Sequence, residues 1–373
     1  MQGKNILFIA QNLNVGGVQT SLINLLQELS GNPEYQIDLF IFSGGTLIKK
    51  LPQTIHVIFG NKRLMLMSTP FSKVIKSKNI INIFIRIFLM IYVRMIGSEK
   101  LYRKIFKNCR IDKKYNVVIS YFNDVPNNYF NQGTNLYALD YANAEEKIAW
   151  IHTDPIISGF DQNYCRRIYK NFNQIICVSK AVKEKMDLLL PEYSKKTQVM
   201  YNKFNRKEIE FLSNEYPIYY DKNKLNIITV ARVDNTSKRI NEIVNMCLRL
   251  KNEEIVNFCW RIIGDGPDFV RNKKEVHKLK LDNLIIFEGE KLNPYPYMKH
   301  SDLFALYSAY EGFPMVIGEA IALGIPILTK EYAAAHEQIS LDQGYIAKSD
   351  DEFYDQLKQN IMKKSAQTLG GKL

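Results

Sequence analysis

Short runs of apolar residues recur along the first half of the chain, and most are rich in β-branched and aromatic side chains. Each run is nearly continuous in apolar residues, which is typical of strands covered on both faces of a parallel sheet. Helical periodicity lies between several of them, as in residues 18–29, where four leucines fall on one face. The strands predicted here are residues 5–10, 36–42, 116–121, 149–152 and 175–179. This alternation of strands and helices predicts an α/β domain.

The same alternation begins again in the second half of the chain. A polar stretch over residues 206–224 contains serine, asparagine, proline and aspartate, which is typical of a linker. Beyond it we predict strands at residues 225–231, 258–263, 284–288, 303–307 and 325–329, and helices at residues 237–250, 267–279 and 314–323. The sequence therefore predicts two doubly wound, Rossmann-like domains, residues 1–205 and 225–373, that face each other across a central cleft.

The composition fits two globular domains and excludes other classes. A chain of 373 residues with 46% hydrophobic and 12% aromatic side chains is neither disordered nor collagen-like. The five cysteines have no C-x-x-C spacing and no D-x-D motif is present, so we expect neither disulfides nor a metal. The first apolar run stops at Gln11, which favours a strand over a signal peptide. The uncharged run at residues 87–93 is far short of the roughly 20 residues that span a bilayer, so a cytoplasmic protein is expected.

The net charge of +12 is concentrated in one segment. Residues 62–110, called the basic segment below, carry twelve Lys and Arg against the single acid Glu99, a balance of +11. On a helix, two asparagines share one arc with Arg86 and Arg94 while the other positions are apolar. Such a helix is expected to lie on an anionic membrane surface, with Lys73, Lys76 and Arg86 among the contacting charges. The alternative is a buried crossover helix with a solvated basic edge. Nucleic acid is disfavoured because the apolar residues are mainly aliphatic.

Two glycines follow the first strand where a helix begins. Gly16 and Gly17 precede the helix predicted from residue 18, and their spacing does not match the G-x-G-x-x-G of nicotinamide-binding folds. Glycines at a strand-to-helix turn let backbone N–H groups approach an anion, which the helix dipole also favours. A phosphate site and a plain tight turn both fit this pattern.

Cations follow the first strand of the second half. Arg232 stands at the end of that strand, and Lys238 lies six residues later, near the expected start of a helix. Two cations at the carboxyl end of a strand can hold a diphosphate, although ordinary surface charge explains either one alone. Gly264 opens a G-D-G-P turn after the next strand, which repeats the strand-to-helix geometry.

The densest group of candidate residues is Y-E-G-F-P-M-V-I-G-E-A at residues 310–320. Pro314 suits the first turn of a helix, which places Glu311 before that helix and Glu319 about a turn and a half inside it. One carboxylate can meet a ligand at the helix start, while the other accepts hydrogen bonds from hydroxyl groups. The alternative is a charge that complements the helix dipole, together with a solvated glutamate.

Taken in order, these motifs resemble the retaining glycosyltransferases of family 4, which have the two-domain GT-B fold. The resemblance covers residues 5–344 and departs from the family pattern at Ala231, where relatives carry glycine, and at residues 333–337, which lack a glycine pair. The matching pieces are Gly16-Gly17, Trp150 to His152, Val178-Ser179, Val199 to Asn202, Arg232 with Lys238, Gly264 to Pro267, and Glu311 with Glu319.

The resemblance implies a role for each matching residue. The diphosphate of a nucleotide-sugar would be held by Arg232 and Lys238, and its ribose by Glu319. Glu311 and His152 would contact the donor sugar. The implied donor-binding residues are Gly16, Gly17, Arg232, Lys238, Gly264, Glu311, Phe313, Pro314, Met315 and Glu319, and the implied catalytic residues are Glu311, His152, Arg232 and Lys238.

The implied activity is that of a retaining, metal-independent hexosyltransferase without a cofactor. Its donor would be UDP-linked rather than GDP-linked, and its acceptor a polyprenyl-linked glycan in the synthesis of a surface polysaccharide such as a capsule. The expected location is the cytoplasmic face of the cell membrane. Two alternatives stay open: a non-catalytic GT-B subunit that binds a glycan or a partner transferase, and a sugar-nucleotide epimerase.

Overall fold

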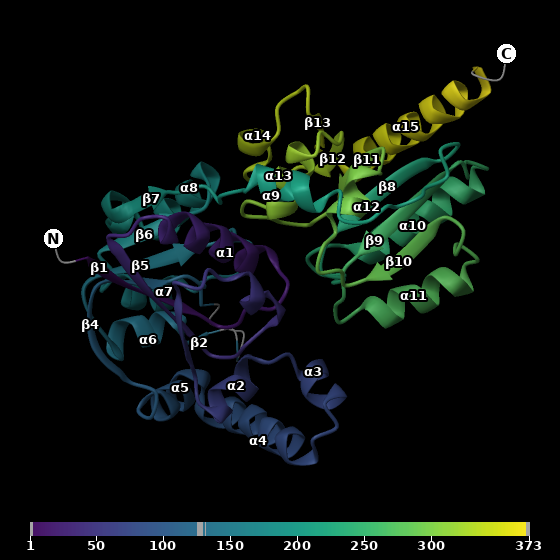
Figure 1. The fold of residues 1–373 in the computed structure, drawn as a ribbon. Helices are drawn as coiled ribbons and strands as arrows, with labels where there is room; N and C mark the ends of the chain where they lie inside the picture. Colours follow the sequence, from purple (N-terminus) through teal and green to yellow (C-terminus); the bar gives the residue numbers. More distant parts are fainter. Residues whose placement is uncertain (1–2, 125–129, 131, 371–373) are drawn as a thin grey trace. The chain divides into compact units, whose positions relative to one another are not determined.

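The computed structural model describes residues 3–124, 130 and 132–370, and the chain divides into two units, residues 1–203 and 204–373 (Figure 1). Each unit has its own parallel sheet and buried core, so each is described by itself. The prediction of two Rossmann-like α/β domains is confirmed. That the domains face a central cleft stays a prediction.

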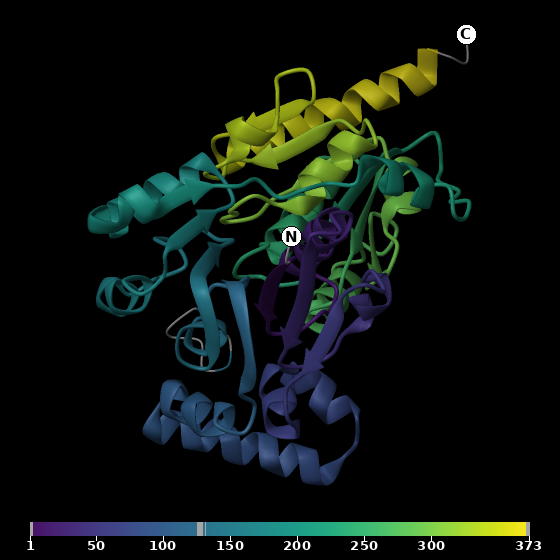
Figure 2. The same cartoon turned by 60° about the vertical axis from the view of Figure 1, so that its left-hand side comes forward.

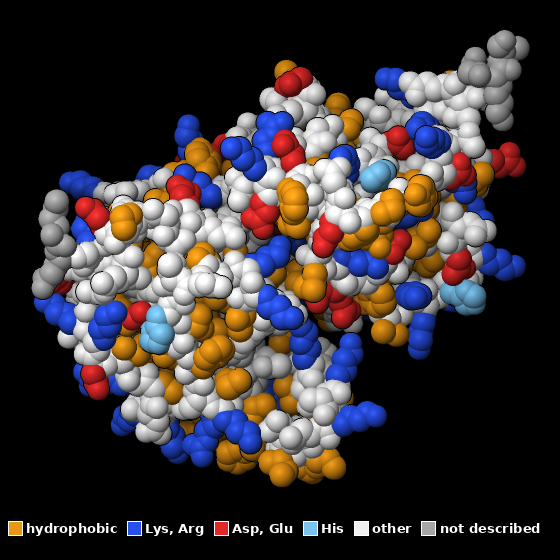
Figure 3. Space-filling model, viewed as in Figure 1, with side chains coloured by type: hydrophobic (Ala, Val, Ile, Leu, Met, Phe, Trp, Pro, Cys, Tyr) orange, Lys and Arg blue, Asp and Glu red, His pale blue; other side chains and the backbone are white. Residues whose placement is uncertain are grey.

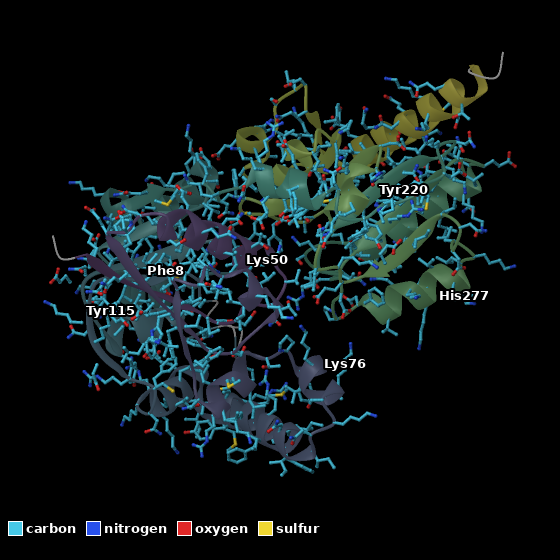
Figure 4. The ribbon with its side chains drawn as sticks, viewed as in Figure 1. Phe8, Lys50, Lys76, Tyr115, Tyr220 and His277 are labelled. Atoms are coloured by element: carbon cyan, nitrogen blue, oxygen red, sulfur yellow. The ribbon has the colours of Figure 1, made fainter. Side chains whose placement is uncertain are left out.

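Among the described residues, the N-terminal unit has a seven-stranded parallel sheet in the order β3-β2-β1-β4-β5-β6-β7. The strands are β1 (Lys4–Ala10), β2 (Tyr35–Ile41), β3 (His56–Phe59), β4 (Ile111–Ser120), β5 (Ala142–Ile151), β6 (Gln174–Cys177) and β7 (Thr197–Val199). Because β1 pairs with both β2 and β4, the order in which strands are added reverses between β1 and β4. Phe8 on β1 and Tyr115 on β4 are buried, as expected for strands covered on both faces (Figure 4).

Helices cover this sheet, and α2 to α5 lie together in one group (Figure 1). Asparagine side chains cap two of them: Asn61 accepts the N–H of Leu64 at the start of α2, and Asn79 accepts that of Asn82 at the start of α4. The helices are α1 (Gly17–Ser30), α2 (Lys62–Ser68), α3 (Phe71–Lys76), α4 (Ile80–Ile96), α5 (Ser98–Phe106), α6 (Thr134–Asp140), α7 (Gln162–Tyr169) and α8 (Lys180–Leu189), with 3₁₀ turns at Thr46–Lys50 and Pro191–Lys196.

Among the described residues, the C-terminal unit has a six-stranded parallel sheet in the order β10-β9-β8-β11-β12-β13, which reverses between β8 and β11. The strands are β8 (Leu225–Val230), β9 (Phe258–Ile263), β10 (Ile285–Gly289), β11 (Leu303–Leu306), β12 (Ile327–Lys330) and β13 (Gly344–Ala347). The buried indole of Trp260 donates to the Thr229 hydroxyl at 2.9 Å, which donates to the Ala305 carbonyl at 2.6 Å. These bonds satisfy buried polar groups and join the three central strands.

The C-terminal helix α15 packs against β8, β12 and β13 (Figure 2). Four of its apolar side chains, which recur at helical spacing, lie in the core of this unit: Phe353, Tyr354, Leu357 and Ile361. The helices are α9 (Arg206–Leu212), α10 (Ile240–Asn252), α11 (Phe269–Lys278), α12 (Tyr295–Lys299), α13 (Met315–Ala322), α14 (Ala335–Gln338) and α15 (Asp350–Gly370).

The structure differs from the sequence predictions between the units and at the sheet edges. The expected linker at residues 206–224 begins with helix α9, because Ile209 is buried in the core of the C-terminal unit. Strands β3, β7 and β13 were not predicted. Each is a strand of three or four residues at the edge of its sheet.

Helix α4 turns Arg86, rather than most of its apolar side chains, toward the protein. Arg86 is 5% exposed and lies on the buried face with Leu89 and Val93, while most apolar side chains of α4 are exposed. The guanidinium of Arg86 stacks on the ring of Phe130, 3.7 Å from its centroid. The expectation that Arg86 contributes to a basic surface is therefore wrong. The alternative of a buried crossover helix with a solvated basic edge is also wrong, because most apolar side chains of α4 are exposed.

Candidate functional site

Lys238 and Glu311 meet where the strand order of the C-terminal sheet reverses. Lys238 follows β8 and Glu311 follows β11, and these paired parallel strands end at the same edge of the sheet. The Lys238 ammonium forms an ion pair with Oε1 of Glu311, and the Ser308 hydroxyl donates to that oxygen at 2.7 Å. Within the described part of the chain, Oε2 of Glu311 receives no hydrogen bond, so this oxygen can accept one from a ligand.

Arg232 lies in the same loop as Lys238 and is exposed. Among the described residues it forms no ion pair, which leaves its guanidinium open to an anion. Burial raises the pKa of the Tyr310 hydroxyl, the carboxylates of Asp234 and Glu311 raise it further, and the charge of Arg232 lowers it. The charges of Asp234, Glu311 and Arg232 therefore all lie near the Tyr310 hydroxyl.

Gly264 and Gly266 let the turn after β9 pack against the loop that carries Arg232. A Cβ atom at Gly264, whose φ is +143°, would lie 1.9 Å from the Ala231 carbonyl oxygen. One at Gly266 would lie 2.2 Å from the Val233 carbonyl oxygen. Backbone contact between the two loops therefore requires glycine at both positions, whether or not a ligand binds.

Glu319 is buried on helix α13, 6% exposed, and the Tyr295 hydroxyl donates to its Oε1 at 3.3 Å. Burial, together with the charge of Glu319, raises the pKa of Tyr295 well above its usual range. Tyr295 therefore stays a neutral donor that holds this carboxylate.

The loop before α13 is fixed by side chains outside the motif. The Gln338 amide donates to the Pro314 carbonyl at 2.8 Å, and the Tyr332 hydroxyl donates to Gln338 Oε1 at 2.8 Å. Pro314 and Met315 are buried, while the ring of Phe313 packs against that of Phe204. Helix α13 begins at Met315, and no side chain of its N-cap residue, Pro314, accepts a hydrogen bond from the first N–H groups of the helix.

In the N-terminal unit, the loop with Gly16 and Gly17 follows β1, at the reversal between β1 and β4. A Cβ atom at Gly16 would meet only the flexible end of the Gln19 side chain, so packing within this unit does not require glycine there. Gly45 is different, because a Cβ atom at this position would lie 2.0 Å from the Leu13 carbonyl carbon. Gly45 lets a second loop approach the loop after β1, and no sequence motif indicated this role.

His152 follows β5 at the same edge of the N-terminal sheet. Its Nε2 lies 2.7 Å from the Tyr121 carbonyl oxygen, which can only accept, so Nε2 carries the proton. Burial lowers the pKa of His152 to about 3, and the imidazole is neutral. Its buried Nδ1 has no hydrogen-bond partner among the described residues. The histidine therefore presents an acceptor, suited to a hydroxyl group.

Asp124 is a buried carboxyl group that the sequence analysis missed. It follows β4 and accepts hydrogen bonds from the N–H and hydroxyl of Thr134, at 3.2 and 3.0 Å. Burial raises its pKa to about 7, against these hydrogen bonds, which lower it. Its other oxygen, Oδ2, has no partner within the described residues. Ten residues separate Asp124 from Thr134, so no local pattern indicates their contact.

The predicted site residues of each domain lie at the carboxyl edge of that domain's sheet. Ser308, Tyr295 and Gln338 were missed, although the S-x-x-E spacing of Ser308 and Glu311 is a recognisable signal. No three His, Cys, Asp or Glu side chains are grouped as a metal site in the described ranges. These arrangements can bind an anion beside hydroxyl-rich groups in the C-terminal unit and accept hydrogen bonds in the N-terminal unit.

Comparison with known proteins relates the chain to glycosyltransferases. Residues 213–367 match the family described as Glycosyl transferases group 1. An uncharacterized glycosyltransferase of Methanocaldococcus jannaschii is 26% identical over 212 residues, which are 53% of this chain and 51% of that protein. The N-acetyl-alpha-D-glucosaminyl L-malate synthase of Bacillus anthracis is 27% identical over 210 residues, 53% of each chain. The chain thus spans about half the length of these relatives.

Solved structures extend the likeness over both units. The HepE protein of Anabaena, in complex with UDP and glucose, has a TM-score of 0.65 at 16% identity, over 98% of this chain and 92% of that one. TarM has a TM-score of 0.62 at 13% identity, over 98% and 92% of the two chains. The chain therefore has the GT-B fold, and its residues 213–367 are a glycosyl transferases group 1 domain.

Proposed function

We propose that the protein is a retaining glycosyltransferase that moves a sugar from a UDP-linked donor to a glycan acceptor. The observation that carries this proposal is the contact of Lys238 and Glu311 at the strand reversal of the group 1 domain. A carboxylate beside cations at this edge can bind a sugar hydroxyl next to a diphosphate. Structures of HepE with UDP-glucose and of TarM with UDP support a UDP-linked donor.

The donor diphosphate would replace Glu311 as the partner of Lys238, with Arg232 as the second cation. Glu311 would keep its hydrogen bond from Ser308 through Oε1 and accept a sugar hydroxyl at Oε2. Glu319, held by Tyr295, would accept from the ribose hydroxyls. The backbone at Phe313, Pro314 and Met315 would line the sugar pocket, beside the turn at Gly264.

The reaction would proceed as a same-face displacement assisted by the leaving diphosphate. The bond between the anomeric carbon and the diphosphate breaks as the acceptor hydroxyl bonds to that carbon from the same side. The hydroxyl proton passes to the departing diphosphate. Arg232 and Lys238 stabilise the growing negative charge, which a metal ion would otherwise have to do. His152 would accept a hydrogen bond from the sugar, and Gly16 and Gly17 would approach the diphosphate.

The proposed acceptor is a polyprenyl-diphosphate-linked glycan, and the proposed pathway is surface polysaccharide synthesis of the capsule type. An acceptor of this kind remains in the membrane, so the enzyme would work at its cytoplasmic face. The basic segment, with its balance of +11, would meet the anionic lipids there. No helix in the described residues is both long and apolar enough to cross a bilayer, so contact would be peripheral.

The test is a panel of nucleotide-sugars with polyprenyl-diphosphate-linked glycans, with and without a chelator. Transfer from a UDP-sugar that persists in chelator, with the anomeric configuration kept, is the expected result. Absence of both hydrolysis and transfer with every donor would contradict the proposal. An altered nucleotide-sugar without acceptor would identify an epimerase, and nucleotide binding without turnover would favour a binding subunit.

A further inference from the structure

Helix α4 carries a continuous apolar face that is exposed. Phe84, Phe88 and Met95 are 68%, 65% and 78% exposed, and other apolar side chains surround them. The remaining members are Ile80, Ile81, Ile87 and Ile91. Positions 80, 84, 87, 88, 91 and 95 follow the spacing of one helix face. Isolated exposed apolar residues are common, but a contiguous patch of this kind marks an interaction surface.

The inner face of α4 explains why the apolar side chains point outward. Arg86, Leu89 and Val93 form the buried stripe, with Arg86 stacked on Phe130. Among the described residues, Nε and Nη1 of Arg86 have no hydrogen-bond partner. A surface helix usually turns its apolar side chains inward and its charged side chains outward. Helix α4 does the reverse, with a guanidinium on its inner face and isoleucine and phenylalanine on its outer face. Water is therefore a poor environment for the outer face.

Positive charge surrounds this apolar face. The basic segment has a balance of +11, and Lys73, Lys78, Arg94 and Lys100 of this segment are exposed on α4 or beside it. Figure 3 shows apolar side chains (orange) over α4 at the lower edge of the molecule, with Lys and Arg (blue) beside them. A second copy of the chain would bring two such segments together, so like charges oppose a dimer through this face.

We infer that α4 lies in the plane of an anionic bilayer with its apolar face inserted among the acyl chains. An apolar face bordered by lysine and arginine is the pattern of helices that lie at the membrane interface. The inference rests on the proposed function, in which the basic segment meets anionic lipids, and adds that the apolar face of α4 is inserted. Membrane binding should therefore persist at salt concentrations that screen the surface charges.

The test is sedimentation of the full chain with vesicles of phosphatidylglycerol and phosphatidylcholine. Phe84→Ser with Phe88→Ser should weaken partitioning at least tenfold, because most of the inserted aromatic surface is lost. Phe211→Ser is the matched control, since Phe211 is 78% exposed on α9 of the C-terminal unit, and it should leave partitioning unchanged. The wild type should keep measurable binding at about 0.5 M salt, where surface charges are screened, and the double variant should not.

A second measurement reports the depth of insertion directly. Tryptophan in Phe88→Trp should be quenched by lipids brominated on their acyl chains, whereas tryptophan in Phe211→Trp should not. Equal partitioning of the Phe84 and Phe88 variant and wild type, or no quenching at position 88, would overturn the inference. So would a concentration-dependent dimer that this variant abolishes. Hydrolysis of the donor without vesicles should be the same in wild type and variant, so failure of insertion and failure of the proposed chemistry are distinguishable.

Discussion

The strand reversals of the two sheets differ in how their polar groups are satisfied. In the C-terminal unit, Glu311 is bound by Lys238 and Ser308, and Glu319 by Tyr295. In the N-terminal unit, buried atoms of Ser120, Asp124 and His152 have no partner among the described residues. Of the described buried side-chain atoms without a partner, only Oδ1 of Asn241 lies in the C-terminal unit.

This difference indicates two modes of binding. An anion that binds Lys238 has to replace Glu311 as its partner, so its net binding free energy is the difference between two charged contacts. A ligand at the N-terminal reversal would satisfy groups that are unpaired and therefore costly to bury. The first arrangement suits a charged diphosphate, and the second suits uncharged hydroxyl groups.

The largest effect is expected from breaking the ion pair. Lys238→Ala and Glu311→Gln should each lower kcat of donor turnover by about 10² to 10³, because each removes a charge aligned with the reacting groups. The double variant should lose less than the product of the single losses, since the two residues act as a pair. Rates with a saturating UDP-sugar measure this effect.

Lys364→Ala is the matched control for the ion pair. It removes a pair of 2.9 Å with Asp302, which precedes β11 at the opposite edge of the same sheet. Its turnover should equal that of the wild type. If Glu311→Gln turns over as fast as this control, the C-terminal reversal is not the catalytic centre.

Changing His152 tests the N-terminal reversal and should have a smaller effect. His152→Ala removes the uncharged hydrogen bond that we propose to the sugar, so kcat should fall about tenfold. His152→Asn can keep an acceptor near Nδ1 and should retain more activity. Because the pKa of His152 is lowered to about 3, the wild-type rate should show no ionisation of this group between about pH 5 and 8. A change in the wild-type rate near pH 6.5 that is absent in His152→Asn would contradict this account.

Asp124→Asn tests the cost of burying a carboxyl group of which one oxygen, Oδ2, has no partner among the described residues. Between its ordinary pKa of 3.8 and about 7, the folded protein holds a proton that the unfolded chain has lost. The free energy of unfolding should therefore fall as the pH rises through this window. The variant should lack this fall, which is roughly 3 kcal/mol between pH 5 and 8 and can be measured by urea unfolding at the two pH values. Asp355→Asn, at an exposed position on α15, should leave the fall unchanged.

The smallest effect is expected for Tyr295→Phe, which removes one hydrogen bond to Glu319 and keeps the ring. The KM for the nucleotide-sugar should rise about threefold to tenfold, with little change in kcat, because the proposed contact of Glu319 with the ribose would loosen. Tyr297→Phe, on the same helix α12, is the matched control. Equal KM values for the two variants would show that Tyr295 does not position Glu319.

Much of the fold could be predicted because it depends on local patterns. Apolar runs located β1, β8 and β9, and the proline before α13 fixed the order of Glu311, helix and Glu319. The partners of the candidate residues could not be predicted. Tyr295 lies 24 residues from Glu319, and only the pairing of β8 with β11 brings Lys238 to Glu311.

By itself, the sequence determined two α/β domains, the position of the charged and glycine-rich loops, and the concentration of positive charge in residues 62–110. Only the tertiary structure decided which side of a helix faces the protein and which buried groups have partners. Periodicity divides α4 into two arcs but cannot assign either one to the interior. That assignment depends on the contact of Arg86 with Phe130 and on the packing of α4 against α2, α3 and α5, and no spacing along the chain encodes either.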